Sequence, residues 1–277
     1  MKLSEMKQLL VERQIRLTKS LGQNFLHDGN QLRRIVDAAE LKKSDKVFEI
    51  GPGLGPLTEL LVAEAGEVLA IDKDARLVEL VRELSGKRPG GILQVLNGDA
   101  LDFVKNEPRD WTEWKLVANL PYSIGSPILV EMALAERGPA RMVVTLQLEV
   151  ARRLTAGPGE ADYGVLTLLV QLSYRATNSF KIPASCFFPE PGVDSACVCL
   201  VRRDQAMLSS SQRPFFVRII KRSFSQRRKM MLKLLKEDWP MEELGKAFKE
   251  LPLAPGTRAE KVSLEQFVKL TELLTKE

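Results

Sequence analysis

The sequence predicts a doubly wound α/β sheet followed by a small all-helical domain. Short runs rich in β-branched residues alternate with helical patterns between about residues 30 and 203, which is typical of a mostly parallel sheet. A glycine-rich turn leads from the first predicted strand into a helix, and no β-rich run remains beyond residue 203. We therefore expect two domains, residues 1–203 with an N-terminal extension at 1–20, and residues 204–277.

The elements of the first domain follow one another in the order that this fold requires. The predicted strands are Lys46–Ile50, Val68–Ile71, Gly91–Val95, Lys115–Ala118, Met142–Leu146, Leu166–Leu172 and Ala196–Val201. The predicted helices are Gln31–Glu40, Pro56–Glu64, Ala75–Leu84, Pro127–Ala135 and Leu148–Leu154. Prolines rather than a helix separate the last two predicted strands, so we expect the sheet to end in an antiparallel pair.

The second domain has only helical signals. A helix is expected to begin near Pro214, because proline suits a first helical turn. Apolar residues then recur at helical spacing, and Ser263 followed by Gln266 forms a capping box for the final helix.

Composition excludes several classes of protein. Among 277 residues, 44% are hydrophobic and 28% charged, as in ordinary globular chains, and no apolar run approaches the roughly 20 residues of a membrane span. The first twenty residues lack the pattern of a secretory signal, and three cysteines occur without a CxxC spacing. A single histidine, His27, argues against a metal site and against His-based acid–base catalysis. We expect a reduced, cytoplasmic protein without a metal.

The positive charge is concentrated at the C-terminal end. Residues 1–203 carry 26 basic and 26 acidic side chains, whereas residues 204–277 carry 15 basic and 10 acidic ones. Nine Lys or Arg and no carboxylate lie between Arg213 and Lys236, which favours a polyanion partner over an ordinary solvated surface. We expect about two helical turns to present two basic clusters there, formed by Lys221, Arg222, Arg227, Arg228 and Lys229.

Three strand ends carry groups that suit an adenosine-containing ligand. The segment EIGPGLG at 49–55 runs from a strand into a turn and a helix, and Glu49 suits a cationic ligand better than a pyrophosphate. Asp72 closes the next strand, where a carboxylate can accept hydrogen bonds from ribose hydroxyls. Asp99 follows the third strand, where its carboxylate can accept a hydrogen bond from an adenine amino group. Each aspartate alone could be a helix cap, but the three strand ends together favour the ligand.

A second motif, Asn119-Leu120-Pro121-Tyr122, follows the fourth predicted strand. It could be an ordinary turn after a strand. At this position, however, an amide oxygen and a backbone carbonyl can accept hydrogen bonds from an exocyclic amine, and Tyr122 can stack on a base. Motifs of this type occur in enzymes that methylate planar amino groups.

Together, these motifs resemble the ribosomal RNA adenine dimethyltransferase family. The similarity rests on GQNFL at 22–26, EIGPGLG at 49–55, Asp99-Ala100, NLPYS at 119–123 and FFPEPGVDS at 187–195. It implies a Rossmann-like class I methyltransferase sheet, S-adenosylmethionine as cofactor and rRNA as partner. Within the family the chain is most similar to the bacterial small-subunit branch, which dimethylates the N6 amines of two adjacent adenosines in the 3′-terminal hairpin of 16S rRNA.

The resemblance also implies roles for individual residues. The cofactor site would consist of Asn24, Leu26, Gly51, Gly53, Asp72, Asp99 and Asn119. The catalytic group would be Asn119, Leu120, Pro121, Tyr122 and Phe187, with Phe187 stacking on the flipped base opposite Tyr122 and with Phe188 and Phe180 in the core. The chain departs from the family pattern at Ser123, Gly125 and Asp72, where Asn, Ser or Thr, and Glu are usual.

The expected mechanism depends on positioning rather than on a metal. Hydrogen bonds from N6–H to Asn119 and to the carbonyl of Leu120 or Pro121 would orient the amine, and the target base must leave its stack. Three alternatives stay open: a large-subunit rRNA methyltransferase of the antibiotic-resistance type, another amino methyltransferase, and a non-catalytic ribosome-assembly or RNA-binding factor. We expect a monomer that binds the small ribosomal subunit.

Overall fold

The computed structural model describes residues 1–18, 22–85, 91–107, 109–226 and 228–275, in two compact units. The first unit comprises residues 1–151 and 175–202, and the second comprises residues 152–174 and 203–277. The sequence places the segment 152–174 in the first domain instead. The division at residue 152 falls within helix α7 (Leu148–Thr155). A division inside a helix has no linker, so the sequence shows no change of composition there.

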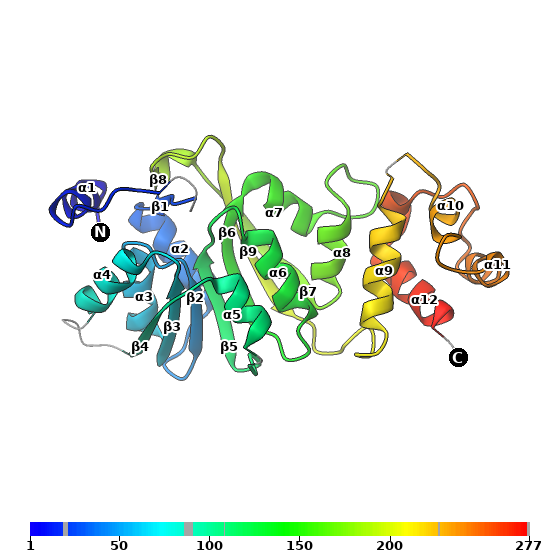
Figure 1. The fold of residues 1–277 in the computed structure, drawn as a ribbon, viewed down its shortest axis with the longest axis horizontal. Helices are drawn as coiled ribbons and strands as arrows, with labels where there is room; N and C mark the ends of the chain where they lie inside the picture. The colour runs from blue at the N-terminus through cyan, green and yellow to red at the C-terminus, as the bar shows by residue number, and fades with distance from the viewer. Residues whose placement is uncertain (19–21, 86–90, 108, 227, 276–277) are drawn as a thin grey trace. The chain divides into compact units, whose positions relative to one another are not determined.

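A seven-stranded sheet forms the centre of the first unit, in the order β4-β3-β2-β5-β6-β9-β7 (Figure 1). Strands β2 to β6 pair in parallel, and β9 runs antiparallel to β6. The strand bounds are β2 Lys46–Ile50, β3 Glu67–Asp72, β4 Ile92–Asn97, β5 Trp114–Asn119, β6 Arg141–Gln147, β7 Tyr174–Ile182 and β9 Ser195–Arg202. The parallel order and the antiparallel strand near the end of the sheet confirm the predicted fold class.

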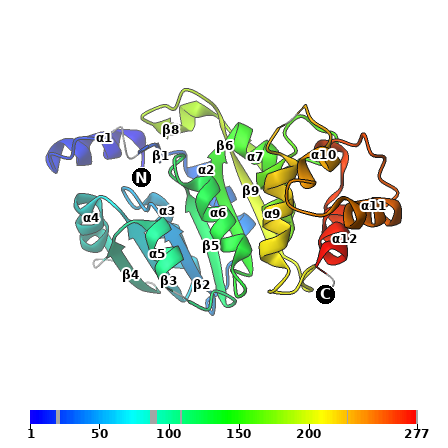
Figure 2. The same cartoon turned by 45° about the vertical axis from the view of Figure 1, so that its right-hand side comes forward.

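Helices cover both faces of this sheet because side chains alternate along each strand. Val47 packs in a core cluster with α2 (Gly29–Ala39) and α3 (Pro56–Glu64). Its neighbour Phe48 faces the other way, where its ring centroid lies 5.9 Å from that of Phe103 in α5. Figures 1 and 2 show α5 and α6 on the face opposite α2. The remaining helices of these layers are α4 Ala75–Ser85, α5 Ala100–Asn106 and α6 Gly125–Leu134.

The predicted strand at 166–172 is wrong, because this segment forms helix α8 (Val165–Gln171). The run at 166–172 is mostly apolar, and a short run of this kind has no clear period that separates a buried helix from a buried strand. The Thr167 hydroxyl accepts a hydrogen bond from the Gly164 N–H and so supports a helical start. Strand β7 follows instead; its mostly exposed, polar residues carry no strand signal of their own.

The N-terminal segment joins the first unit through a two-stranded ladder. Strand β1 (Phe25–Leu26) pairs antiparallel with β8 (Phe187–Phe188), which follows a short 3₁₀ helix at Ala184–Cys186. Helix α1 (Leu3–Glu12) precedes it, and Met6 and Leu10 share a core cluster with residues of α4. The GQNFL segment therefore adjoins the FFPEPGVDS segment.

The second unit is helical in the part that the structure describes, which confirms the predicted all-helical domain. Pro214 lies in the first turn of α9 and Ser263 caps α12 as expected. The helices beyond α8 are α9 Arg213–Ser223, α10 Met231–Leu235, α11 Met241–Glu250, a 3₁₀ turn at Ala259–Lys261, and α12 Leu264–Leu274. None of the helices in the described ranges is long and apolar enough to cross a membrane.

Candidate active site

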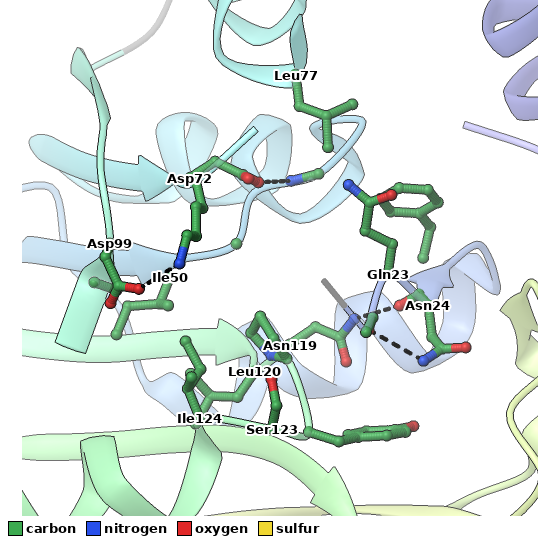
Figure 3. Close-up of a pocket in the computed structure, with 18 of the residues that line it drawn as sticks. Gln23, Asn24, Ile50, Asp72, Leu77, Asp99, Asn119, Leu120, Ser123 and Ile124 are labelled. Carbon is green, nitrogen blue, oxygen red and sulfur yellow. Dashed lines mark hydrogen bonds and ion pairs between the residues drawn. The ribbon is translucent and has the colours of Figure 1, made fainter. Parts of the chain in front are cut away.

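A cavity lies at the carboxyl ends of the parallel strands and encloses about 870 Å³, including the part open to solvent (Figure 3). Parallel strands bring their carboxyl ends to the same edge of a sheet, so residues distant in sequence meet there. The predicted site residues that line this cavity are Asn24, Gly51, Gly53, Asp72, Asp99, Asn119, Leu120, Pro121 and Tyr122. Nine of the nineteen described residues that line the cavity are therefore among the predicted site residues.

The glycine turn after β2 requires glycine for steric reasons. Gly51 and Gly53 have φ of +70° and +59°, a region that residues with a side chain rarely adopt. A Cβ on Gly53 would lie 2.7 Å from the ring of Phe25, and one on Gly51 would lie 3.3 Å from Pro121. These close approaches let the N-terminal segment and the Asn119–Tyr122 turn border the same cavity.

Asp72 lies beside this turn at the end of β3. One of its carboxylate oxygens accepts a hydrogen bond from the Gly53 N–H at 3.3 Å, and the other accepts one from the Asp74 N–H at 2.9 Å. Burial raises the pKa of Asp72. The carboxylate is therefore fixed in direction, and each oxygen keeps capacity to accept a further hydrogen bond.

Glu49 is 1% exposed and lies just before the glycine turn. Its Oε2 atom has no hydrogen-bond partner among the described residues, and burial raises its pKa to about 8, with the nearby Asp72 charge acting in the same direction. A buried carboxyl group with an unpaired oxygen is costly when ionised. Glu49 does not itself line the cavity, and a cation close to it would offset that cost.

Asp99 uses its two carboxylate oxygens differently. Oδ1 caps α5 by accepting hydrogen bonds from the N–H groups of Leu101 at 2.8 Å and Asp102 at 3.3 Å. Oδ2 pairs with the Lys73 ammonium at 2.9 Å, and this hydrogen bond is the main reason that the pKa of Asp99 is lowered. Lys73 also lines the cavity. No local pattern distinguishes Lys73 from an ordinary surface lysine, so sequence reasoning missed it.

Asn119 presents a buried acceptor. Its Nδ2 donates a hydrogen bond to the Asn24 carbonyl at 2.9 Å, which fixes the plane of the amide (Figure 3). Its Oδ1 is buried and has no hydrogen-bond partner among the described residues. Buried polar atoms are nearly always paired, and an unpaired one calls for an explanation. A ligand N–H at this position would supply the missing partner.

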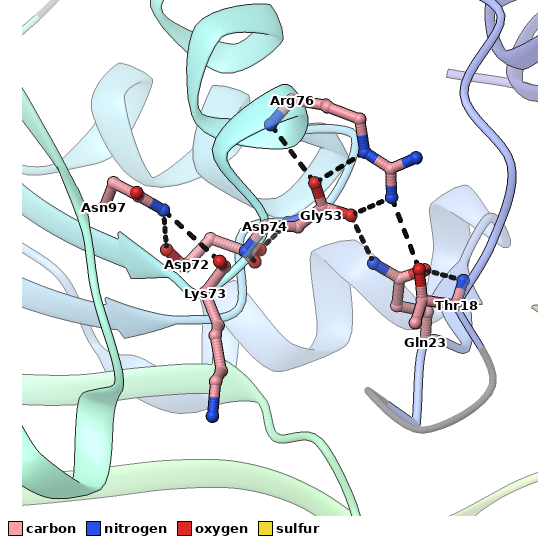
Figure 4. A network of polar contacts seen from close by, with 8 residues as sticks. All are labelled: Thr18, Gln23, Gly53, Asp72, Lys73, Asp74, Arg76 and Asn97. Atoms are coloured by element: carbon pink, nitrogen blue, oxygen red, sulfur yellow. Dashed lines mark hydrogen bonds and ion pairs between the residues drawn. The ribbon is translucent and has the colours of Figure 1, made fainter.

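A polar network fastens the N-terminal segment to the loop after β3 (Figure 4). The Gln23 side chain accepts a hydrogen bond from the Thr18 N–H at 2.9 Å and donates one to Asp74 at 3.1 Å. Asp74 also pairs with Arg76 at 2.6 Å. Gln23 of the GQNFL motif thus secures the wall that carries Asn24, a role that sequence reasoning did not assign.

The described residues contain no group of three or more His, Cys, Asp or Glu that could hold a metal ion. The cavity instead combines an unpaired amide oxygen, fixed carboxylates and backbone turns held open by glycine. These groups can bind a nucleoside and an amine, and they can orient both.

Comparison with known proteins agrees with this geometry. The model of the family described as ribosomal RNA adenine dimethylase matches residues 14–276. The chain belongs to this family. A protein named ribosomal RNA small subunit methyltransferase A from Geobacillus sp. strain WCH70 is 38% identical over 267 residues, which cover 92% of this chain and 91% of that protein. A protein of the same name from Leuconostoc mesenteroides is 40% identical over 272 residues, covering 95% and 91%.

Solved structures of rRNA adenine dimethylase relatives share the fold. A dimethyladenosine transferase from Plasmodium falciparum superposes with a TM-score of 0.77 at 26% identity, covering 89% of this chain and 95% of that chain. The 23S rRNA methyltransferase ErmE superposes with a TM-score of 0.70 at 28% identity, covering 91% and 100%. This rRNA adenine dimethylase therefore has the class I methyltransferase fold that the resemblance implies.

Two residues predicted for the dimethylase site do not reach the cavity. Leu26 and Phe187 are paired across the β1–β8 ladder and are 2% and 3% exposed in the core cluster that contains α2 and α3. A ring enclosed by core residues offers no face to a base in this structure, so the stacking of Phe187 on a target base stays a prediction. Phe188 alternates to the other face of the ladder, where it is half-buried beside Lys7.

The basic stretch of the dimethylase differs from its prediction in two respects. Helix α9 ends at Ser223, so the two basic clusters do not lie on one continuous helix. Arg222 pairs with Glu237 at 2.6 Å and with Asp238, two carboxylates just beyond the one-sign stretch. Lys221, Arg228 and Lys229 are exposed, whereas Arg227 lies outside the described residues.

Proposed function

We propose that this dimethylase transfers methyl groups from S-adenosylmethionine to the N6 amines of two adjacent adenosines in the 3′-terminal hairpin of 16S rRNA. The observation that carries the proposal is the buried, unpaired Oδ1 of Asn119 in a cavity that also contains fixed carboxylates. The names of curated relatives at 38% and 40% identity support the choice of the small subunit.

The cavity fits the cofactor group by group. Asp72 offers acceptor oxygens for ribose hydroxyls, and the Oδ2 of Asp99, which also pairs with Lys73, offers one for the adenine amine. The turn at Gly51 and Gly53 leaves room for the methionine end, and the buried Glu49 favours a cation nearby. When bound, S-adenosylmethionine supplies an activated methyl group on its positively charged sulfur.

Asn119 and Leu120 would hold the target amine. The Asn119 Oδ1 accepts one N6–H, and a backbone carbonyl accepts the other. The Pro121 carbonyl already accepts hydrogen bonds from the N–H groups of Ile124 and Gly125, each at 3.1 Å. No described backbone hydrogen bond of a turn or loop ends on the Leu120 carbonyl, so it is the better acceptor. Two fixed acceptors localise the nitrogen lone pair toward the methyl donor.

Tyr122 and the basic residues of the second unit would hold the RNA. The Tyr122 ring lines the cavity and offers a face on which the flipped adenine stacks. The exposed Lys221, Arg228 and Lys229, together with Arg227, would contact phosphates without reading the sequence.

The decisive test is methyl transfer from labelled S-adenosylmethionine to small subunits that lack the modification. We expect N6,N6-dimethyladenosine in the 3′-terminal hairpin of 16S rRNA, identified by mass spectrometry of nucleosides and fragments. An Asn119→Ala variant should bind the cofactor without producing it. Absence of label in 16S rRNA with the wild-type protein would refute the proposal.

The similarity to ErmE supports a second candidate, adenine methylation of large-subunit rRNA. A parallel reaction with large subunits and with naked 23S rRNA separates the two candidates. Label in 23S rRNA alone would favour the second, and label in neither rRNA would favour a non-catalytic assembly factor.

A further inference from the structure

Ser195 and Tyr122 join two motifs that are far apart in the sequence. Ser195 is the last residue of the FFPEPGVDS segment and the first residue of β9, and it is fully buried. Its hydroxyl oxygen lies 2.6 Å from the hydroxyl oxygen of Tyr122. Tyr122 is half-buried and lines the cavity. One end of its ring is therefore anchored in the protein while the ring borders the site.

The backbone on both sides of Ser195 is held by hydrogen bonds and strand pairing. Ser195 pairs with Gln147 in the antiparallel register of β9 and β6. The preceding residue, Asp194, accepts a hydrogen bond from the Leu148 N–H through its carbonyl and one from the Ala184 N–H through its side chain, both at 3.0 Å. Ser195 is thus fixed by the sheet, whereas Tyr122 lies in the turn between β5 and α6 and depends on such a partner.

We propose that Ser195 is a positioning residue for methyl transfer, which acts by holding the Tyr122 ring in the orientation that stacks on the target adenine. The inference rests on the proposed function of the same site. A phenol hydroxyl that loses a buried partner turns toward water, and the ring turns with it because the two move as one rigid group. The ring then adopts several orientations, and only one of them stacks on the adenine. The adenine amine therefore spends less time in the position that methyl transfer requires.

A double-mutant cycle tests this role with full-length protein and unmodified small subunits. The four proteins are the wild type, Ser195→Ala, Tyr122→Phe and the double variant. We expect each single variant to lower kcat by about 3- to 10-fold, the change that loss of one hydrogen bond predicts. The double variant should be no slower than either single one, because both changes remove the same bond.

Two further measurements separate positioning from general damage. The dissociation constant of S-adenosylhomocysteine should be the same in all four proteins, because the bond lies on the acceptor side of the site. Ser173→Ala is a matched control, since it removes a buried hydroxyl that has no hydrogen-bond partner among the described residues. It should leave kcat unchanged.

The outcomes are distinct. An effect of Ser195→Ala that persists in the Tyr122→Phe background, or that comes with weaker cofactor binding, would show a structural role and overturn the inference. Unchanged kcat in Ser195→Ala would also overturn it. A wild-type protein that binds S-adenosylhomocysteine but methylates no rRNA would refute the proposed function itself.

Discussion

At the scale of single residues, Asn119 has one amide group with two separate tasks. Its nitrogen donates a hydrogen bond to the Asn24 carbonyl, and its oxygen, which has no partner among the described residues, is the acceptor that we propose for the substrate amine. We expect Asn119→Ala to lower kcat by about 100-fold or more, as loss of a fixed acceptor or donor in other active sites does. Cofactor affinity, measured by calorimetry, should change by less than about threefold. Lost cofactor binding with normal turnover at saturation would contradict this division of tasks.

One substitution at Asp99 can distinguish its role as a helix cap from its proposed role in ligand binding. Asp99→Asn retains an oxygen for the cap of α5, so we expect the free energy of unfolding to fall by less than about 1 kcal/mol. It removes the ionic partner of Lys73 and one acceptor from the cavity. Cofactor binding should therefore weaken by about 1–3 kcal/mol.

Urea unfolding and calorimetry on the same preparation measure both quantities. Equal losses of stability and of cofactor affinity would mean that Asp99 acts only through the helix.

At the scale of elements, the glycine turn after β2 depends on the β1 segment that packs over it. We expect Gly53→Ala to weaken cofactor binding by about tenfold or more, because the new methyl group would enter the Phe25 ring and φ is positive. Gly245→Ala is the matched control, since nothing lies within 4 Å of a Cβ there and alanine favours a helix. Normal cofactor affinity in Gly53→Ala would show that β1 can move aside.

The elements with a strong local pattern were predictable from the sequence. β2 and α3 have the predicted bounds, because a buried strand, a glycine turn and a proline in the first helical turn all mark them. The β1–β8 ladder was not predictable, because two-residue strands carry no period. The burial of Leu26 and Phe187 was not predictable for the same reason, because it depends on a partner that only the tertiary structure reveals.

Among the residues in and around the cavity, too, some positions were predictable from the sequence and others were not. Asp72, Asp99 and Asn119 were predictable because each ends a parallel strand or closely follows one, and topology alone brings such ends together. Lys73, Gln23 and Ser195 depend on side-chain partners 26, 51 and 73 residues away along the chain. No pattern within the sequence encodes these pairings.

At the scale of the whole molecule, the pH dependence of stability should show a contribution from Glu49. Its pKa rises from an ordinary value of 4.5 to about 8 on folding, so the folded protein binds this proton more tightly than the unfolded chain does. The stability that this group contributes is complete below about pH 4.5 and is lost as the pH rises through about 8.

We therefore expect the free energy of unfolding to decline between these values with a slope of at most about 1.4 kcal/mol per pH unit from this group. Urea titrations across the range measure it, and Glu49→Gln should remove the contribution. Parallel profiles for the two proteins would show that Glu49 is ionised in the folded state.

The exposed basic residues of the second unit should determine the salt dependence of RNA binding. Replacing Lys221, Arg228 and Lys229 by Ala should weaken binding to small subunits and lower the slope of log K against log salt by about 1 for each lost phosphate contact. Filter binding at several salt concentrations measures both. Arg222→Ala is the comparison, because its charge is already paired and its loss should change the slope less.

S-adenosylhomocysteine affinity should be unaffected by the triple replacement, since the cavity lies in the first unit. Normal subunit binding by the triple variant at every salt concentration would show an ordinary solvated surface.

The β1–β8 ladder has a consequence for how the protein is made. Asn24 and Phe25, which wall the cavity, lie at a strand whose partner is Phe187–Phe188. A ribosome synthesises the glycine turn, Asp72, Asp99 and Asn119 long before it reaches that partner. The nascent chain can therefore form the contacts of Gln23 with Asp74 and of Asn119 with Asn24 first, whereas the β1–β8 pairing can form only after residue 188 has left the exit tunnel. The last support of this wall is therefore added late in synthesis, by a contact between two segments that lie far apart in the sequence.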